Sequence, residues 1–247
     1  MKKLIIALLF LLGIPLTKAF AQNDTQDTGF YQASINQVVG LYYKTIAENA
    51  HLYNGSEYMQ YIVYNPIGDR NPFFLSIFMQ NGSIFYDGSL YNDAPLTYDI
   101  YKDVLVSLRH NWNYRIQLVT DKVEYFDLAG HHFVRITEDS TKLADGNGFY
   151  ENLFSGKSIS VLVKRKKKKE ERYYNAEFTT FFFPNDHFYI KKDGTYFPVN
   201  SKSSVLDVLK DKKKEIRKYL RKNNISFKPY AEYGIIKAAA YYDQIKN

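Results

Sequence analysis

The stretch "HFYIKKDGTYFPVNSKSSVLDVLKDKKKEIRKYLRKN", residues 187–223, contains a change of hydrophobic period. Up to residue 199, apolar side chains alternate with polar ones around Asp193-Gly194. This pattern is typical of two strands joined by a tight turn, and it places Ile190 opposite Phe197. From Ser201 onward the apolar residues recur three or four positions apart, which is the period of a helix. The stretch therefore predicts an antiparallel sheet that is followed by helices, a fold of the α+β class.

The sequence before residue 187 predicts a meander of antiparallel strands. Aromatic residues make up 17% of the chain, which is rich for a helical protein and natural for a pleated sheet. The stretch 73–91 predicts three strands joined by tight turns at Asn81-Gly82 and Asp87-Gly88. Further strands are expected at 58–64, 104–109, 115–120, 123–128 and 132–137, with a polar loop over 137–148.

Helices are predicted at both ends of the meander. Ser34 can cap a helix over 35–50, and a short helix is expected near 203–209. Asp211 is predicted to cap a basic helix that ends at Asn223-Asn224, and Pro229 precedes a last helix over about 230–245. The expected fold is a curved antiparallel sheet or half-barrel, with one N-terminal helix and two to three C-terminal helices packed on it.

Residues 1–21 have the three parts of a signal peptide. A basic start, Met1-Lys2-Lys3, precedes an apolar run over 4–16, and Ala19-Phe20-Ala21 is a cleavage pattern. The run of about 13 residues is shorter than the roughly 20 that span a bilayer. We expect cleavage after Ala21, a flexible tether over 22–33, and a single domain over 34–247 that is β-rich over 58–199 and basic and helical over 201–247. The protein is therefore expected in the periplasm or outside the cell, and not transmembrane after cleavage.

The chain has no cysteine. This excludes disulfides, thiol catalysis and acyl anchoring through cysteine.

Charge is distributed unevenly along the chain. Residues 22–163 carry 9 Lys and Arg against 16 Asp and Glu, a net of −7, and residues 164–247 carry 21 against 10, a net of +11. One explanation is that the two halves attract each other inside one domain. The other is that the basic half faces an anionic partner, such as an envelope lipid or polysaccharide.

The densest basic run is "KRKKKKEER", residues 164–172. Alternating segments flank it, so we predict that it forms the tip of a long hairpin that projects into water. On that interpretation, replacing Lys166 to Lys169 by serine leaves the stability nearly unchanged. Export argues against a nucleic acid as partner, and the residues expected to contact an anionic surface are Lys166, Lys167, Lys168, Lys169, Lys213, Lys214, Arg217, Lys218 and Arg221.

The sequence predicts no catalytic, cofactor or metal site. The "SGKS" stretch, 155–158, resembles the end of a P-loop, but Glu151 stands where the first glycine is needed. His131 and His132 are adjacent, so on a strand they point to opposite faces and make a poor metal pair. Carboxylate spacings such as Asp99 and Asp103, or Asp121 and Glu124, arise by chance in an acidic segment. Trp112 lies in a polar stretch. Its ring is expected either to anchor the core or to be exposed as a contact site for a glycan or a lipid.

Three segments of the chain carry a resemblance. The leader end "AFAQ", the stretch "GSIFYDG…APLTYDIYKDVLVSL" and the stretch "YIKKDGTYFPVNSKSSVLDVLKDKKKEIRKYLRKNNISF" resemble uncharacterised secreted proteins of Bacteroidota. That resemblance implies no activity or site residues. Asp139-Ser140-Thr141 is similar to the short acceptor sequence for O-glycosylation in that group. The order of helix and meander is loosely similar to periplasmic lipoprotein carriers.

Three functions remain open at this point. The first is a non-enzymatic envelope protein, binding or structural, with a basic C-terminal face. The others are a periplasmic carrier of an apolar ligand in an open β-barrel cavity and a carboxylate-based hydrolase.

Overall fold

The computed structural model describes residues 31, 33–35, 37–39, 51–59, 61, 70–109, 115–137, 143–174 and 177–246. The chain divides into two compact units, Met1–Ile46 and Ala47–Asn247. In the first unit, the described residues 31, 33–35 and 37–39 are helical. The helix predicted over 35–50 is therefore present at 35 and 37–39, and its other positions lie outside the described residues. Ser34 was predicted as its cap, but helical residues already precede it.

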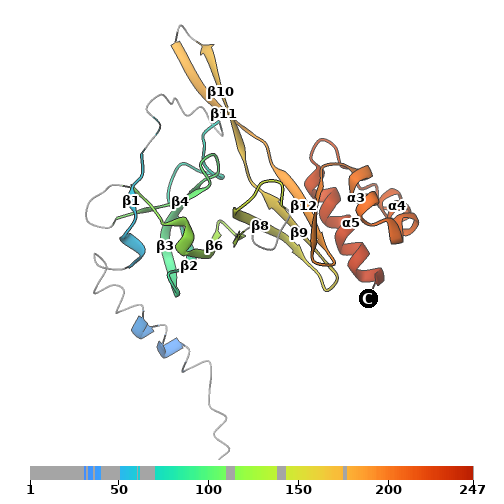
Figure 1. The fold of residues 1–247 in the computed structure, drawn as a ribbon, viewed down its shortest axis with the longest axis horizontal. Helices are drawn as coiled ribbons and strands as arrows, with labels where there is room; N and C mark the ends of the chain where they lie inside the picture. Colours follow the sequence, from blue (N-terminus) through green and yellow to red (C-terminus); the bar gives the residue numbers. More distant parts are fainter. Residues whose placement is uncertain are drawn as a thin grey trace, which may run out of the picture. The chain divides into compact units, whose positions relative to one another are not determined.

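The second unit is dominated by antiparallel strands (Figure 1). Within the described residues, eleven strands form one sheet in the order β1-β5-β4-β3-β2-β6-β7-β8-β9-β12-β13. Strands β1 and β13 lie at opposite edges, so the sheet does not close into a barrel. The strands are β1 (Ser56–Glu57), β2 (Gln80–Tyr86), β3 (Ser89–Asp99), β4 (Val104–Leu108), β5 (Arg115–Gln117), β6 (Val123–Leu128), β7 (His131–Ile136), β8 (Gly148–Ser155), β9 (Ile159–Lys164), β12 (His187–Lys192) and β13 (Thr195–Val199).

Two hairpins follow the turn chemistry of the sequence. Asp193 and Gly194 both have positive φ, and Ile190 pairs with Phe197 across the β12–β13 ladder as predicted. Asp87 and Gly88 likewise turn β2 into β3 with positive φ. Both turns confirm that Asp-Gly between alternating segments predicts a tight hairpin.

The Asn81-Gly82 turn was predicted wrongly, because both residues lie inside β2. Gly82 pairs with Ala94 of β3 and with Leu128 of β6. A Cβ atom on Gly82 would lie 2.4 Å from the carbonyl oxygen of Asp127. The glycine is therefore needed for a close approach between strands, which a sequence does not distinguish from a turn.

The strand predicted over 58–64 is also wrong at the described positions. Strand β1 ends at Glu57, and neither Tyr58 nor Tyr61 belongs to a strand. Both side chains instead donate hydrogen bonds to the Oδ2 atom of Asp99, each at 2.7 Å. A shared carboxylate therefore holds Tyr58 and Tyr61.

The excess aromatic residues form a packed core on the sheet. Tyr98 lies edge to face on Phe126, Phe133 and Phe149, with ring centroids 5.3, 5.2 and 5.8 Å away. These four side chains are fully buried. Edge-to-face packing stabilises the core beyond the area that the rings bury.

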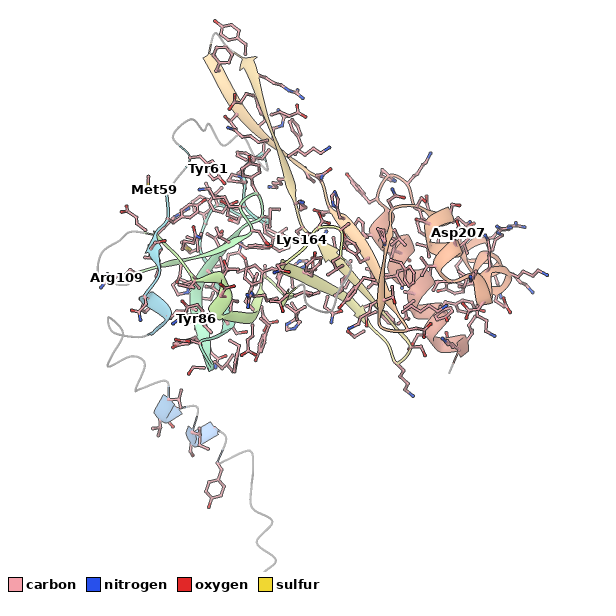
Figure 2. The ribbon with its side chains drawn as sticks, viewed as in Figure 1. Met59, Tyr61, Tyr86, Arg109, Lys164 and Asp207 are labelled. Carbon is pink, nitrogen blue, oxygen red and sulfur yellow. The ribbon has the colours of Figure 1, made fainter. Side chains whose placement is uncertain are left out.

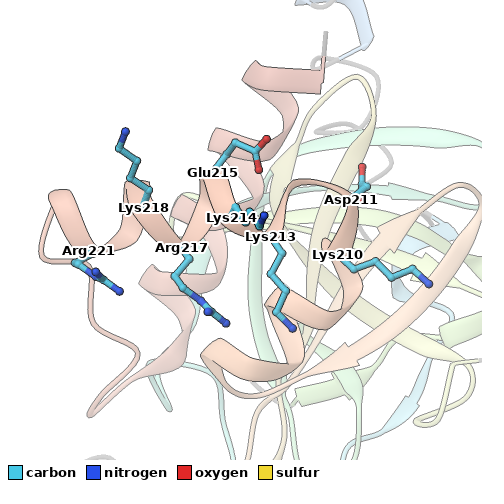
Figure 3. Close-up of a pocket in the computed structure, with 8 residues that line it drawn as sticks. All are labelled: Lys210, Asp211, Lys213, Lys214, Glu215, Arg217, Lys218 and Arg221. Carbon is cyan, nitrogen blue, oxygen red and sulfur yellow. The ribbon is translucent and has the colours of Figure 1, made fainter.

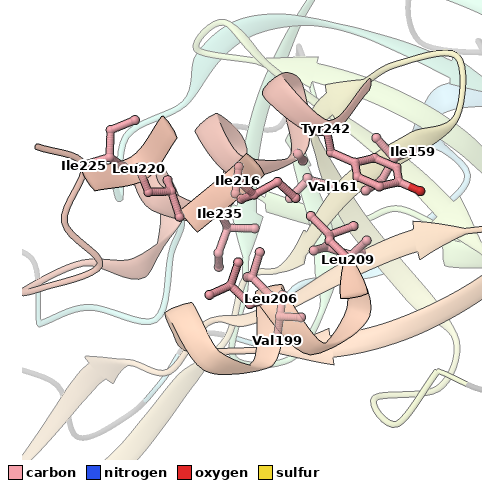
Figure 4. Close-up of a cluster of buried hydrophobic side chains, with 14 residues drawn as sticks. Ile159, Val161, Val199, Leu206, Leu209, Ile216, Leu220, Ile225, Ile235 and Tyr242 are labelled. Carbon is pink, nitrogen blue, oxygen red and sulfur yellow. The ribbon is translucent and has the colours of Figure 1, made fainter. Parts of the chain in front are cut away.

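The C-terminal helices share a second core with the strands β9, β12 and β13 (Figure 4). They are α3 (Lys202–Val208), α4 (Lys213–Lys222) and α5 (Ala231–Lys246). Ser201 caps α3 through a capping box with Ser204. Asp211 was predicted to cap α4, but no side chain caps that helix, because Asp211 binds Lys192 and Tyr242 instead.

Strands β10 (Lys167–Tyr174) and β11 (Glu177–Pro184) form a separate two-stranded ribbon, here called the arm. The hairpin-tip prediction for the lysine run is wrong. The strands of the arm meet at the pair Tyr174 and Glu177, while Lys167 lies at the other end, opposite Pro184. The reason is that β9 pairs with β12 and not with β11, so the lysines fall where the chain leaves the sheet.

Candidate functional site

The structure separates the predicted anion-contacting residues into two groups. Five of them line one open hollow of about 710 Å³ along the outer face of α4 (Figure 3). The lysines of the run 166–169 lie elsewhere, at the base of the arm. The residues that line the hollow are Lys210, Asp211, Lys213, Lys214, Glu215, Arg217, Lys218 and Arg221.

Helix α4 presents its cations outward because its apolar residues have helical spacing. Ile216 and Leu220, four positions apart, are buried in the second core. Residues four apart lie on the same face of a helix, so the cations between them face away from the core. In Figure 3, Lys213 and Arg217 extend in the same direction from the helix, and Lys218 and Glu215 leave on the other side.

Few of these cations are neutralised. Lys213 forms an ion pair with Asp207 at 2.8 Å, and both side chains are largely exposed. Asp211 is bound by Lys192, which lies outside the hollow; burial acts to raise the pKa of Asp211, but the bonds from Lys192 and Tyr242 lower it. In the part of the chain that the structure describes, five lining cations form no ion pair: Lys210, Lys214, Arg217, Lys218 and Arg221. The hollow is therefore strongly cationic.

The other group, at the base of the arm, is largely engaged in structure. Lys166 forms an ion pair with Asp145 at 2.9 Å. The Nζ atom of Lys167 donates to the carbonyl oxygens of Asn71 and Phe73, at 2.6 and 2.8 Å. Lys168 and Lys169 are exposed. The first two lysines of the run thus bind groups in the body of the fold, although the side chain of Lys166 remains 39% exposed.

Of the two cations before these lysines, Lys164 is buried and the side chain of Arg165 is 11% exposed. The side chain of Lys164 is 4% exposed and binds Asp103 at 2.5 Å (Figure 2). Burial lowers the pKa of Lys164, although Asp103 opposes the shift. A buried ammonium is tolerated only when it is paired in this way.

Arg165 is the centre of a partly buried ion-pair cluster. It binds Glu151, Asp186 and Glu232 at 2.6, 2.7 and 2.8 Å. Burial acts to lower the pKa of Arg165, but the hydrogen bonds to these carboxylates outweigh it and the pKa is raised. The cluster joins β8, the β11–β12 connection and the first turn of α5. The available signal was the alternation of Val161 and Val163 in β9, which predicts that Arg165 faces the same side; it gives no signal for Lys164, on the opposite face.

The carboxylates that converge here are neutralised. Glu151 also contacts the Nδ1 atom of His131 at 2.5 Å, while the adjacent His132 contacts Asp127. The two histidines thus have separate carboxylate partners. Among the described residues, no group of three or more His, Asp or Glu side chains is arranged to hold a metal ion. The arrangement around Arg165 can link elements of the fold, and it presents no free acid and base pair.

The "SGKS" turn binds a carboxylate of the protein itself. The backbone N–H groups of Lys157 and Ser158 donate to the Oδ2 and Oδ1 atoms of Asp243, at 3.0 and 2.7 Å. A Cβ atom on Gly156 would lie 2.5 Å from the carboxylate carbon of Asp243. The turn thus anchors α5, and the anion that its backbone N–H groups bind is a side chain of the protein.

Trp112 and Asp139-Ser140-Thr141 lie outside the described residues. In the described part of the chain, no helix combines the length and the apolar character that crossing a membrane requires.

Comparisons with known proteins give no relative. No family model, no curated protein and no solved structure matches the chain.

Proposed function

We propose that this protein is exported and that it binds anionic surfaces, without catalysis, through the cationic face of α4. The observation that carries the proposal is the row of unpaired cations around one hollow, Lys210, Lys214, Arg217, Lys218 and Arg221. Such a row is costly through mutual repulsion unless an anion neutralises it. The ligand chemistry is a repeated phosphate or carboxylate group, displayed by an envelope lipid or by an acidic polysaccharide.

The spacing along α4 suits a repeated anion. Lys213, Arg217 and Arg221 follow one another at intervals of four residues, so that their Cα atoms are about 6 Å apart along the axis. The hollow is open and not enclosed, and its lining includes no aromatic ring. We therefore infer adhesion that depends on charge density, not recognition of one small molecule. The signal-peptide pattern of residues 1–21 supports an envelope surface as the partner.

The experiment is co-sedimentation of the mature protein with vesicles of phosphatidylcholine containing phosphatidylglycerol, across a salt series. A parallel series measures binding to the acidic polysaccharide alginate. We expect binding at low salt that weakens steeply as the Debye length falls to about 8 Å near physiological ionic strength. The stronger of the two series identifies the source of the anion.

The test variant carries Arg217→Gln, Lys218→Gln and Arg221→Gln. Each cation near an anionic surface contributes about 1 kcal/mol, so the affinity should fall roughly 100-fold. The control carries Lys157→Gln, Lys202→Gln and Lys228→Gln, which removes the same charge away from α4. Equal losses in the two variants would show that only net charge matters, and absence of binding at low salt would refute the proposal outright.

A further inference from the structure

The cations of the α4 hollow fall into two rows, because residues four positions apart lie on one face of a helix. The first row is Lys213, Arg217 and Arg221, and the second row is Lys210, Lys214 and Lys218. In Figure 3 the side chains of the first row extend toward the same side of the helix, whereas Lys218 leaves on the other side. The two acids of the hollow, Asp211 and Glu215, also point to that other side. The first row is therefore a line of cations with no acid of the hollow beside it.

The first row is long and accessible. Eight positions separate Lys213 from Arg221, which corresponds to about 12 Å along the helix axis. Arg217 and Arg221 are exposed, and the side chain of Lys213 is 40% exposed in its contact with Asp207. Exposed ion pairs of this kind contribute little, so Lys213 can exchange Asp207 for another anion. The row thus fits an extended chain that carries an anion about every 6 Å.

The composition of the lining argues against a bilayer as the occupant. Every side chain that lines the hollow is charged, and none is apolar. A helix that lies in the headgroup region directs its apolar face toward the acyl chains. The apolar residues Ile216 and Leu220 of α4 are instead buried in the second core. A plane of headgroups also meets the rim of a hollow before its floor, whereas a single chain can lie along the floor.

The chemistry of the row favours carboxylates on a stiff polymer. Two of the three cations are arginines, Arg217 and Arg221, and a guanidinium binds a carboxylate through two parallel hydrogen bonds. A uronic acid carries its carboxylate directly on a sugar ring, so few torsions are fixed when it binds. The carboxylates of an acidic peptide sit on flexible stems, whose ordering costs entropy. A lining of charged side chains alone offers no apolar anchor that could offset this cost.

We propose that the first row of α4 binds a linear polysaccharide of uronic acids lengthwise, with one carboxylate each on Lys213, Arg217 and Arg221. Lys214 and Lys218 attract the chain through their charge without contacting it. This inference rests on the proposed function and adds its partner: it assigns the anion to a sugar chain and the contact to one row of the hollow.

The first experiment measures affinity against chain length. Oligouronates prepared from alginate, from the disaccharide to the octasaccharide, are titrated calorimetrically into the mature protein at low salt. The affinity should rise steeply up to about three or four sugar residues, where each added carboxylate reaches another cation of the row. Beyond that length it should rise only with the number of positions in which the chain can bind. A steady rise through the octasaccharide overturns the lengthwise site, even where alginate itself binds.

The second experiment compares the two rows at equal charge. One variant carries Lys213→Gln, Arg217→Gln and Arg221→Gln, and the other carries Lys210→Gln, Lys214→Gln and Lys218→Gln. The first should weaken binding of the tetrasaccharide roughly 100-fold, and the second by less than about tenfold. Glutamine is about as favourable in a helix as lysine or arginine, so both variants should keep the melting temperature. Equal losses would assign binding to net charge and overturn the inference, while the proposed function would stand.

A conservative variant tests the guanidinium contacts with the charge retained. Arg217→Lys with Arg221→Lys keeps every positive charge and a good helix former at both positions. It should still weaken binding of the tetrasaccharide several-fold, because lysine cannot make the paired hydrogen bonds to a carboxylate. Unchanged affinity in this variant contradicts the assignment of carboxylates to the two arginines.

Competition separates the sugar chain from other polyanions. Polyglutamate and phosphatidylglycerol vesicles, matched in anion concentration, should displace the tetrasaccharide less effectively than alginate does. Stronger displacement by polyglutamate would make the occupant an acidic peptide, and stronger displacement by the vesicles would make it a lipid surface. Either result overturns this inference and leaves the hollow as an anion site. Failure of every one of these anions to bind at low salt overturns the proposed function as well.

Discussion

Asp145 accepts hydrogen bonds from three side chains that the sequence places far away from it. Tyr189, Lys166 and His187 approach its carboxylate at 2.5, 2.9 and 2.8 Å. Burial acts to raise the pKa of Asp145, but these hydrogen bonds outweigh it and lower the pKa from 3.8 to about 2. One residue thus holds the start of the arm to β12.

This lowered pKa predicts acid sensitivity. Because the folded-state pKa lies below the unfolded value, ionised Asp145 contributes stability above pH 3.8 and loses it as the pH falls toward 2. An Asp145→Asn variant should be less stable by about 1–3 kcal/mol at neutral pH, with a flatter stability curve between pH 4 and 2. Urea unfolding across that pH range measures both effects. Equal slopes for the two proteins would contradict the assignment.

At the scale of elements, the basic run has two parts with different structural roles. Lys164 to Lys167 attach the base of the arm to buried acids and carbonyl groups, whereas Lys168 and Lys169 continue along the exposed edge of β10. The cations of the uniform sequence "KRKKKK" therefore contribute differently to stability, because residues 164–167 find partners in the body of the fold and residues 168 and 169 lie on the arm after it has left that body.

Adjacent substitutions separate these roles. Lys167→Ser should destabilise the protein by about 1–3 kcal/mol, since the buried carbonyl groups of Asn71 and Phe73 lose a charged donor. Lys168→Ser, one position away, should stay within about 0.5 kcal/mol, as surface changes usually do. Thermal unfolding of both variants tests the difference. If Lys167→Ser were as harmless as Lys168→Ser, the original hairpin-tip interpretation would regain support.

At the scale of the whole molecule, the charge asymmetry has two uses. Acids of the first half, Asp103, Asp145 and Glu151, bind cations of the second half at Lys164, Lys166 and Arg165. The cations of α4 do not take part in these pairs. Attraction between the two halves thus accounts for the cations at 164–166. An anionic partner is the explanation that remains for the cations at 210–221.

Export is the whole-molecule prediction. The pattern of residues 1–21 predicts a mature chain that starts at Gln22 and lies outside the cytoplasm. N-terminal sequencing of the protein from fractionated cells measures both the cut and the compartment. Recovery of a chain that retains Met1 in the cytoplasmic fraction would remove the anionic envelope as a partner.

The sequence by itself determined the features that depend on neighbouring residues. The Asp-Gly hairpins, the ladder of β12 with β13, strand β6 and the outward cations of α4 all follow from local periods and turn chemistry. Those signals depend on residues only a few positions apart, so they can be read from the sequence alone.

The tertiary structure decided which segments meet. In the fold, Gly82 lies inside a strand. Asp211 binds Lys192 and Tyr242 instead of capping α4. Arg165 binds three carboxylates from segments distant in sequence. The fold also paired β9 with β12, which moved the lysine run from the tip of the arm to its base. Each of these outcomes depends on contacts between residues far apart in sequence, where burial and charge pairing override local preference, and that is why only the fold reveals them.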